Sequence, residues 1–204
     1  MLERFRRFWT SLLAPVADGL LRAGVSPDAV TLVGTLGVCA GALGFFPRGQ
    51  LWLGVLVVTA FVFSDLIDGY MARRSGHSSR WGAWLDSTLD RIGDAAVFGG
   101  LVLWFSGDGD DRVLAALALW CLVMGSVTSY ARARAESLGM QASGGIAGRA
   151  DRLVAVLVLA FFSDVLDLPI LLDVVLWALA AASTVTVVQR MIVVRRQAMA
   201  KTGL

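Results

Sequence analysis

The chain has 204 residues, of which 57% are hydrophobic, and a formal net charge of +2 at neutral pH. Its mean hydropathy of +0.71 is too high for a soluble domain of this size and indicates a protein that crosses a membrane several times. Both cysteines, Cys39 and Cys121, lie inside apolar runs, so neither a disulfide framework nor a thiolate metal site is expected. No nucleic-acid partner is expected either.

Residues 1–24 predict a helix that lies on the membrane surface. Their apolar side chains recur at helical spacing, opposite Arg4, Arg6 and Arg7. Pro15 and Asp18 interrupt the apolar run, and no cleavage site follows it, so a secretory signal is not expected. A basic amphipathic helix of this kind binds at the interface between lipid and water.

Six apolar windows follow, each suited to a hydrocarbon core that takes roughly 20 residues to cross. Capping residues, prolines and glycines delimit them. The predicted spans are Ala29 to Phe46, Leu51 to Arg74, Trp81 to Phe105, Arg112 to Glu136, Ala150 to Phe162 and Pro169 to Arg195. The expected fold is an all-α integral membrane protein, in which an amphipathic interfacial helix precedes six transmembrane helices over residues 26–198. No repeat or soluble domain is visible, so residues 1–204 are expected to form one domain.

Basic residues predict how the chain is oriented. Of its 18 Lys and Arg residues, only Arg48 and Arg112 fall on the side of the first, third and fifth connections. The positive-inside rule therefore predicts a multi-pass protein of the cell membrane (the plasma or inner membrane) with both termini in the cytoplasm. The connection from Gly139 to Gly148, a glycine-rich loop, is expected on the same side.

Four aspartates lie at the cytoplasmic ends of the second and third predicted spans: Asp65, Asp68, Asp86 and Asp90. Their spacings of three and four residues place each pair on one helix face, so two adjacent helices would direct all four into one space. Ionised carboxylates at membrane depth are costly, which makes such a group a functional hypothesis. Oxygen ligands favour Mg²⁺ or Mn²⁺ over zinc. With two ions, three of these carboxylates would be ligands and Asp90 could remain a base.

Three further residues beside the aspartates suggest a nucleotide diphosphate. Gly69 and Gly82 lack side chains and would let a bulky ligand approach the backbone closely. Arg73, one turn beyond Gly69, could hold a phosphate through paired hydrogen bonds.

The spacing D-x2-D-G-x2-A-R-x8-G-x3-D-x3-D, from Asp65 to Asp90, resembles the signature of the CDP-alcohol phosphatidyltransferases. The resemblance implies a six-helix membrane fold, a homodimer, and a reaction in which an alcohol displaces CMP from a CDP-linked lipid. It further implies that the four aspartates hold two metal ions, that Asp90 is also the general base, and that Gly69, Arg73 and Gly82 contact the CDP group. The active site would face the cytoplasm.

A second basic cluster bears on the acceptor alcohol. Arginines at the ends of the last three predicted spans suggest an acceptor that carries its own phosphate. Over most of the chain the sequence also looks like the actinobacterial phosphatidylinositol phosphate synthases, notably at 129–136, 145–153 and 187–190. That resemblance implies CDP-diacylglycerol and inositol 3-phosphate as substrates. It also implies that three arginines bind the acceptor phosphate: Arg132, Arg152 and Arg190.

Alternatives remain open from the sequence. Glycerol 3-phosphate also carries a phosphate, so phosphatidylglycerophosphate synthesis is the nearest rival. A divalent-cation transporter is a more distant one, and it would distribute carboxylates along a path through the bilayer. Arginines at these depths also fit positive-inside topology and lipid headgroups. Asp94 and the loop from Gly139 to Gly148 receive no role.

Overall fold

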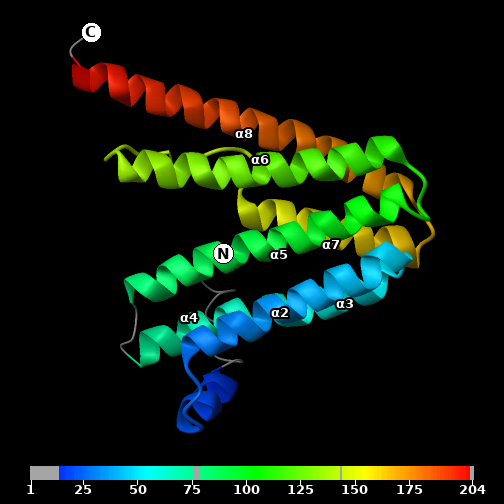
Figure 1. Cartoon of the computed structure of the whole chain (residues 1–204), viewed down its shortest axis with the longest axis horizontal. Helices are drawn as coiled ribbons and strands as arrows, with labels where there is room; N and C mark the ends of the chain where they lie inside the picture. The colour runs from blue at the N-terminus through cyan, green and yellow to red at the C-terminus, as the bar shows by residue number, and fades with distance from the viewer. Residues whose placement is uncertain (1–13, 76–78, 143, 203–204) are drawn as a thin grey trace. The chain divides into compact units, whose positions relative to one another are not determined.

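The computed structural model describes residues 14–75, 79–142 and 144–202, apart from the side chains of Asp65, Lys201 and Thr202. Within these ranges all regular secondary structure is helical, which confirms the all-α prediction (Figure 1). The elements are α2 (Pro27–Phe45), the 3₁₀ turn η1 (Phe46–Arg48), α3 (Leu51–Val62), α4 (Ser64–Arg74), α5 (Arg80–Ser106), α6 (Arg112–Ser137), α7 (Arg149–Val165) and α8 (Ile170–Thr202).

Side-chain caps explain where several helices begin. Ser26 precedes α2, and its hydroxyl accepts a hydrogen bond of 3.2 Å from the Ala29 N–H. Asp111 precedes α6, and one carboxylate oxygen accepts hydrogen bonds of 2.9 Å from Val113 and Leu114. Each cap satisfies N–H groups that have no partner within the helix.

The predicted second span is divided into α3 and α4 at Phe63. The Ser64 hydroxyl donates a 2.6 Å hydrogen bond to the Phe61 carbonyl, three residues before it. A serine that bonds back to its own helix competes with the regular backbone pattern and bends the helix. This break lies directly before the aspartates of α4.

Four helical stretches in the described part of the chain are long and apolar enough to cross a membrane. They are Pro27–Arg48, Leu51–Arg74, Arg112–Ser137 and Ile170–Ala200. Large apolar side chains on these stretches are exposed, including Leu36 at 67% and Trp177 at 59%, as expected of helices that face lipid. The count of six spans stays a prediction, because α5 carries several charges and α7 has only 17 residues.

The predicted amphipathic helix lies partly outside the described residues, which begin at Ala14. Residues 14–22 are helical, and Gly24 ends this segment with a φ of +77°. A glycine in the left-handed region commonly terminates a helix. Asp18 in this segment lies 3.8 Å from the Arg74 guanidinium at the end of α4.

The chain divides into two compact units, and the first comprises Met1–Phe45 and Leu53–Val97. In it, α2 packs against α4 through a glycine-bearing face. A Cβ at Gly34 would overlap the Ser64 hydroxyl, and one at Gly37 would overlap the Phe61 ring. These glycines therefore permit the close approach of the helices that carry the candidate site.

The second unit comprises Phe46–Trp52 and Phe98–Leu204. In it α8 packs against both α6 and α7 (Figure 1). Polar links between α6 and α8 include a 2.9 Å hydrogen bond from the Trp120 indole N–H to the Thr184 hydroxyl. The described residues of the loop that joins α6 to α7 are non-helical, as the glycines from Gly139 to Gly148 predict.

Candidate functional site

A pocket of about 270 Å³ lies in the first unit, at the N-terminal ends of α2 and α5 and along α4. Six of the eight signature positions line it: Asp68, Gly69, Ala72, Arg73, Gly82 and Asp86. The pocket therefore brings together residues that the sequence places on two separate helices. Its other lining residues are Pro27, Asp28, Thr31, Ser79 and Ala83.

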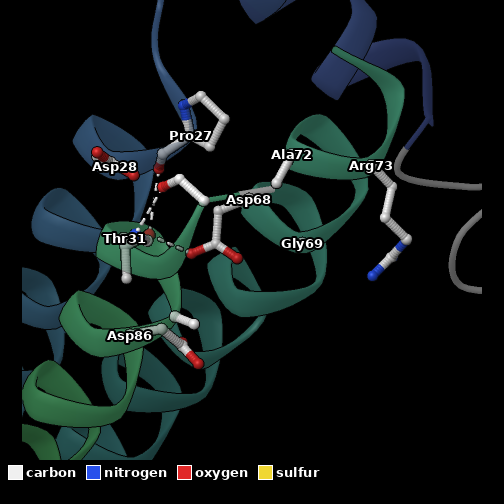
Figure 2. A pocket seen from close by; sticks show the side chains of 11 residues that line it. Pro27, Asp28, Thr31, Asp68, Gly69, Ala72, Arg73 and Asp86 are labelled. Carbon is white, nitrogen blue, oxygen red and sulfur yellow. Dashed lines mark hydrogen bonds between the residues drawn. The ribbon is translucent and has the colours of Figure 1, made fainter. Parts of the chain in front are cut away.

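Asp68 is the most deeply placed of the charged groups in the pocket, with 7% of its surface exposed. The Thr31 hydroxyl of α2 donates a 2.6 Å hydrogen bond to its Oδ2 (Figure 2). Asp86 and Arg73 lie near enough to interact electrostatically with the Asp68 carboxylate. Figure 2 shows these three side chains facing one space, so negative and positive groups line the same opening.

The two glycines of the pocket are not required by packing within the protein. A Cβ at Gly69 would lie 3.4 Å from the nearest Arg73 nitrogen, and one at Gly82 would lie 3.4 Å from the Ser79 hydroxyl and 3.6 Å from Asp28. These are ordinary contact distances. Because alanine would fit the protein at both sites, what the glycines provide is room in the pocket.

The start of α5 is fixed by Ser79, whose hydroxyl accepts a 2.9 Å hydrogen bond from the Gly82 N–H. This cap sets the first turn of the helix and so the position of Gly82 at the pocket wall. Asp86 follows one turn later and is exposed. The N-terminal ends of α2 and α5 both open on the pocket, and helix N-termini favour anionic ligands.

The predicted metal ligands are only partly assembled. Asp68 and Asp86 line the pocket, whereas Asp90 does not, and its carboxylate lies 3.3 Å from the Arg91 guanidinium. Among the side chains that the structure describes, no three His, Cys, Asp or Glu groups could together hold a metal ion. Asp65, one turn before Asp68, has no described side chain. Two of the predicted carboxylate ligands thus face one opening, and oxygen donors of this kind fit a hard divalent cation.

Five lining residues were not predicted as site residues from the sequence, and three of them are polar: Asp28, Thr31 and Ser79. The stretch Ser26-Pro27-Asp28 indicates a helix start, but the same residues also place Asp28 and Thr31 three apart on one face of α2. This spacing is the sequence feature from which a shared role of Asp28 and Thr31 could have been predicted. Nothing in the sequence shows that this face meets Asp68.

The three predicted acceptor-binding arginines lie in the second unit and differ in their surroundings. Arg132 on α6 is exposed and pairs with Glu136 at 2.8 Å. Arg152 on α7 is 2% exposed and donates a 3.3 Å hydrogen bond to the Ala147 carbonyl. Arg190 on α8 donates to the carbonyls of Thr128 and Gly144, at 2.6 and 3.1 Å. Arg132 is close enough to Arg190 to interact with it electrostatically.

Residues 24–188 match the family model described as CDP-alcohol phosphatidyltransferase. The chain belongs to the CDP-alcohol phosphatidyltransferase family. Family membership confirms that the protein is a transferase of phospholipid biosynthesis in a membrane, as the signature predicts.

Among curated members of the family, the phosphatidylinositol phosphate synthase of Streptomyces avermitilis is 52% identical over 97% of this chain and 84% of its own length. That of Cutibacterium acnes is 50% identical over 96% of this chain and 98% of its own. The resemblance to actinobacterial synthases of this name is thereby confirmed.

The chain is also similar to solved structures of the Mycobacterium tuberculosis phosphatidylinositol phosphate synthase. The one with CDP-DAG bound is 47% identical, with a TM-score of 0.86, and covers 92% of this chain and 94% of its own. The one in complex with manganese and citrate is 48% identical, with a TM-score of 0.85, and covers 88% and 87%.

Proposed function

We propose that this enzyme transfers the phosphatidyl group of CDP-diacylglycerol to inositol 3-phosphate and releases CMP, as a phosphatidylinositol phosphate synthase. The observation that carries the proposal is the pocket that joins six signature residues from α4 and α5 in one space. Relatives that are 52% and 50% identical over nearly the whole chain carry the name of this activity.

In the proposed reaction Asp90 accepts the proton of an inositol hydroxyl, and the hydroxyl oxygen attacks the β-phosphorus of the CDP-lipid in line. A P–O bond to inositol forms as the bond from the β-phosphorus to the bridging oxygen breaks, and the electron pair of that bond leaves with CMP. Arg73 would hold the diphosphate by paired hydrogen bonds. Gly69 and Gly82 would leave room for the CDP group.

A divalent cation is proposed as cofactor, supported by the manganese complex of the mycobacterial relative and by the carboxylates of the pocket. Asp65, Asp68, Asp86 and Asp90 would hold two ions of Mg²⁺ or Mn²⁺. Such ions supply charge neutralisation to a diphosphate and to its leaving group. Arg132, Arg152 and Arg190 are proposed to bind the phosphate of the acceptor.

The proposed membrane arrangement follows the charge distribution. Six helices would cross the cell membrane as a single domain over residues 1–204, preceded by the amphipathic helix of residues 1–24. Both termini and the active site would face the cytoplasm, where 16 of the 18 Lys and Arg residues are expected. A homodimer is proposed on the family resemblance.

The deciding experiment measures CMP release by the purified full chain in liposomes containing CDP-diacylglycerol, with inositol 3-phosphate, glycerol 3-phosphate or free inositol as acceptor. We expect release with inositol 3-phosphate and Mg²⁺ or Mn²⁺, and loss of release on addition of EDTA. Asp90→Asn is the control for contaminating hydrolysis, since it should bind the CDP-lipid without turnover. Release with glycerol 3-phosphate alone would replace the proposed acceptor with the rival one.

A further inference from the structure

The described residues of the loop that joins α6 to α7, 138–142 and 144–148, contact one face of α8 through hydrogen bonds. The Thr186 hydroxyl accepts a 3.1 Å hydrogen bond from the Ala147 N–H, and the Arg190 Nε donates a 3.1 Å hydrogen bond to the Gly144 carbonyl. Further along, the Gln197 amide exchanges hydrogen bonds of 2.9 and 2.6 Å with the backbone of Gln141. The three α8 residues are four and seven positions apart, which places them on one side of the helix.

Thr186 is the buried anchor of this contact, with no exposed surface. Its hydroxyl donates a 2.8 Å hydrogen bond to the Ala182 carbonyl in its own helix, which leaves its oxygen to accept from Ala147. Gly145 passes so close that a Cβ there would overlap the Thr186 methyl group, and its φ of +124° excludes most other residues. The loop backbone is thus held against Thr186 by a hydrogen bond and by shape.

The contact continues from Ala147 to Arg152. The Ala147 carbonyl accepts a 3.3 Å hydrogen bond from the Arg152 guanidinium. On α6, Gly125 lies against the same guanidinium, because a Cβ there would be 3.0 Å from its nearest nitrogen. The Ala147 backbone therefore joins the two side chains: its N–H bonds the Thr186 hydroxyl, and its carbonyl bonds the buried Arg152 guanidinium.

We propose that Thr186 is a positioning residue for acceptor recognition: by holding the backbone of Ala147 at its N–H, it positions the Ala147 carbonyl that orients Arg152. The inference rests on the proposed function, in which Arg152 binds the acceptor phosphate. A guanidinium binds phosphate in a fork of fixed geometry, so a small rotation weakens binding of the acceptor. The proposed ligands of the CDP-lipid belong to the other unit, so we expect its KM to change little when this contact is altered.

The test compares Thr186→Val with Thr186→Ser in the full chain in liposomes. Valine keeps the shape and removes the acceptor of the Ala147 hydrogen bond, whereas serine retains that acceptor. For Thr186→Val we expect a rise of about tenfold in the KM for inositol 3-phosphate, with the KM for CDP-diacylglycerol and the kcat within a factor of about two. Thr186→Ser should remain near the wild type.

Thr184→Val is the matched control on the same helix. Thr184 also donates within α8, to Ala180, and accepts from α6 through Trp120, but no hydrogen bond joins it to the loop among the described residues. The Thr184→Val variant should lose about as much thermal stability as Thr186→Val, while its KM for the acceptor stays unchanged. An equal rise of that KM in both variants would show a general packing effect and overturn the proposal.

Inorganic phosphate gives a readout that does not need turnover of inositol 3-phosphate. We expect it to raise the melting temperature of the wild type and of Thr184→Val, and to do so less for Thr186→Val. If the wild type fails to use inositol 3-phosphate yet keeps this pattern, the proposed acceptor is wrong and the positioning role stands. An unchanged phosphate effect, or an unchanged or lower acceptor KM, in a folded Thr186→Val would overturn the role.

Should Thr186→Val fail to fold, Gly145→Ala probes the same contact from the loop side. Its Cβ would push the loop away from the Thr186 methyl group and displace Ala147. As for Thr186→Val, we expect a higher KM for the acceptor and little change in the KM for the CDP-lipid. A folded Gly145→Ala with wild-type acceptor KM would contradict the proposal.

Discussion

Asp68 is a carboxylate that is almost fully buried at the wall of a pocket. A buried carboxylate needs partners, and Thr31 supplies one at 2.6 Å through Oδ2. The hydroxyl engages Oδ2 and so restrains the rotation of the carboxyl group, which also has a hydrogen bond from the Gly69 backbone. Loss of a group that orients a metal ligand in this way typically lowers metal affinity or activity by about 10- to 100-fold.

Thr31→Val is expected to raise the Mg²⁺ or Mn²⁺ concentration for half-maximal activity by roughly tenfold, because the Asp68 carboxylate loses the hydrogen bond from the Thr31 hydroxyl. Titration of the metal in the CMP-release assay measures the effect. Thr31→Ser should restore the wild-type value. Thr35→Val is the control on the same helix, since the Thr35 hydroxyl bonds only the Thr31 carbonyl among the described residues. If both valine variants shift the metal requirement equally, Thr31 has no special role toward Asp68.

For single residues, the sequence predicts the signature positions but not the side chains that orient them, such as Thr31. The spacing of Asp68, Gly69 and Arg73 indicates a ligand site, because a metal-bound diphosphate needs a carboxylate, open space and a guanidinium at these intervals along a helix. Thr31 carries no such signal, since a threonine in an apolar helix is compatible with lipid, core or site. Its role depends on the approach of α2 to α4, which the glycines at positions 34 and 37 permit and only the fold reveals.

Among the elements, α5 divides its surface between packing and the site. Leu85 and Leu89 are buried, while Gly82 and Asp86 line the pocket. The Ser79 cap sets the helix start, so the pocket face is defined from the first turn. Gly82 therefore leaves space at the pocket wall where another residue would place a side chain. This space lowers the stability of the helix, because glycine is about 1 kcal/mol less favourable than alanine in a helix.

Gly82→Ala should therefore keep or slightly raise thermal stability and still impair the enzyme. We expect the KM for CDP-diacylglycerol to rise about tenfold, because the added methyl group occupies the space proposed for the CDP group, while the KM for the acceptor changes little. Gly99→Ala on the same helix is the control, since a Cβ there meets nothing within 4 Å. Equal KM values for the lipid in both variants would remove Gly82 from the proposed binding site.

Helix positions were predictable to within a few residues because hydropathy, caps and glycines delimit them. The exceptions have local causes. The break at Phe63 depends on the hydrogen bond from Ser64 to Phe61, which an apolar run does not reveal. The last helix continues to Thr202, seven residues beyond the predicted end at Arg195, and Gln197 in this extension bonds the loop at Gln141. A polar helix end supported by tertiary contacts gives no hydropathy signal.

For the whole molecule, the six-span prediction depends on α5 and α7 crossing the membrane. With 27 residues, α5 reaches about 40 Å, enough to span a core of about 30 Å despite its charges. With 17 residues, α7 reaches about 25 Å, a mismatch that local thinning of the bilayer can accommodate. The signature places charged residues on α5, so apolar composition alone does not identify this helix as a span.

Accessibility of single cysteines in intact cells tests the six-span topology. A membrane-impermeant maleimide should label Asp108→Cys, between α5 and α6, and Leu166→Cys, after α7, from outside. Arg80→Cys, at the start of α5, and Leu138→Cys, before α7, should react only after the membrane is permeabilised. The physical reason is the positive-inside rule, which keeps the arginine-rich connections in the cytoplasm. Each variant needs a background in which Cys39 and Cys121 are replaced, although the latter is fully buried.

The pairs are chosen so that each helix is judged separately. If α5 lies along the membrane surface and does not cross it, Arg80→Cys and Asp108→Cys react from the same side. The aspartates of α5 would then not belong to a transmembrane helix, and the proposed six-span arrangement of the site would be wrong. If α7 fails to cross, Leu138→Cys and Leu166→Cys react from the same side, which would contradict the proposed depth of Arg152. Opposite reactivity in both pairs, with the arginine-rich ends protected, is the outcome that six spans and a cytoplasmic active site require.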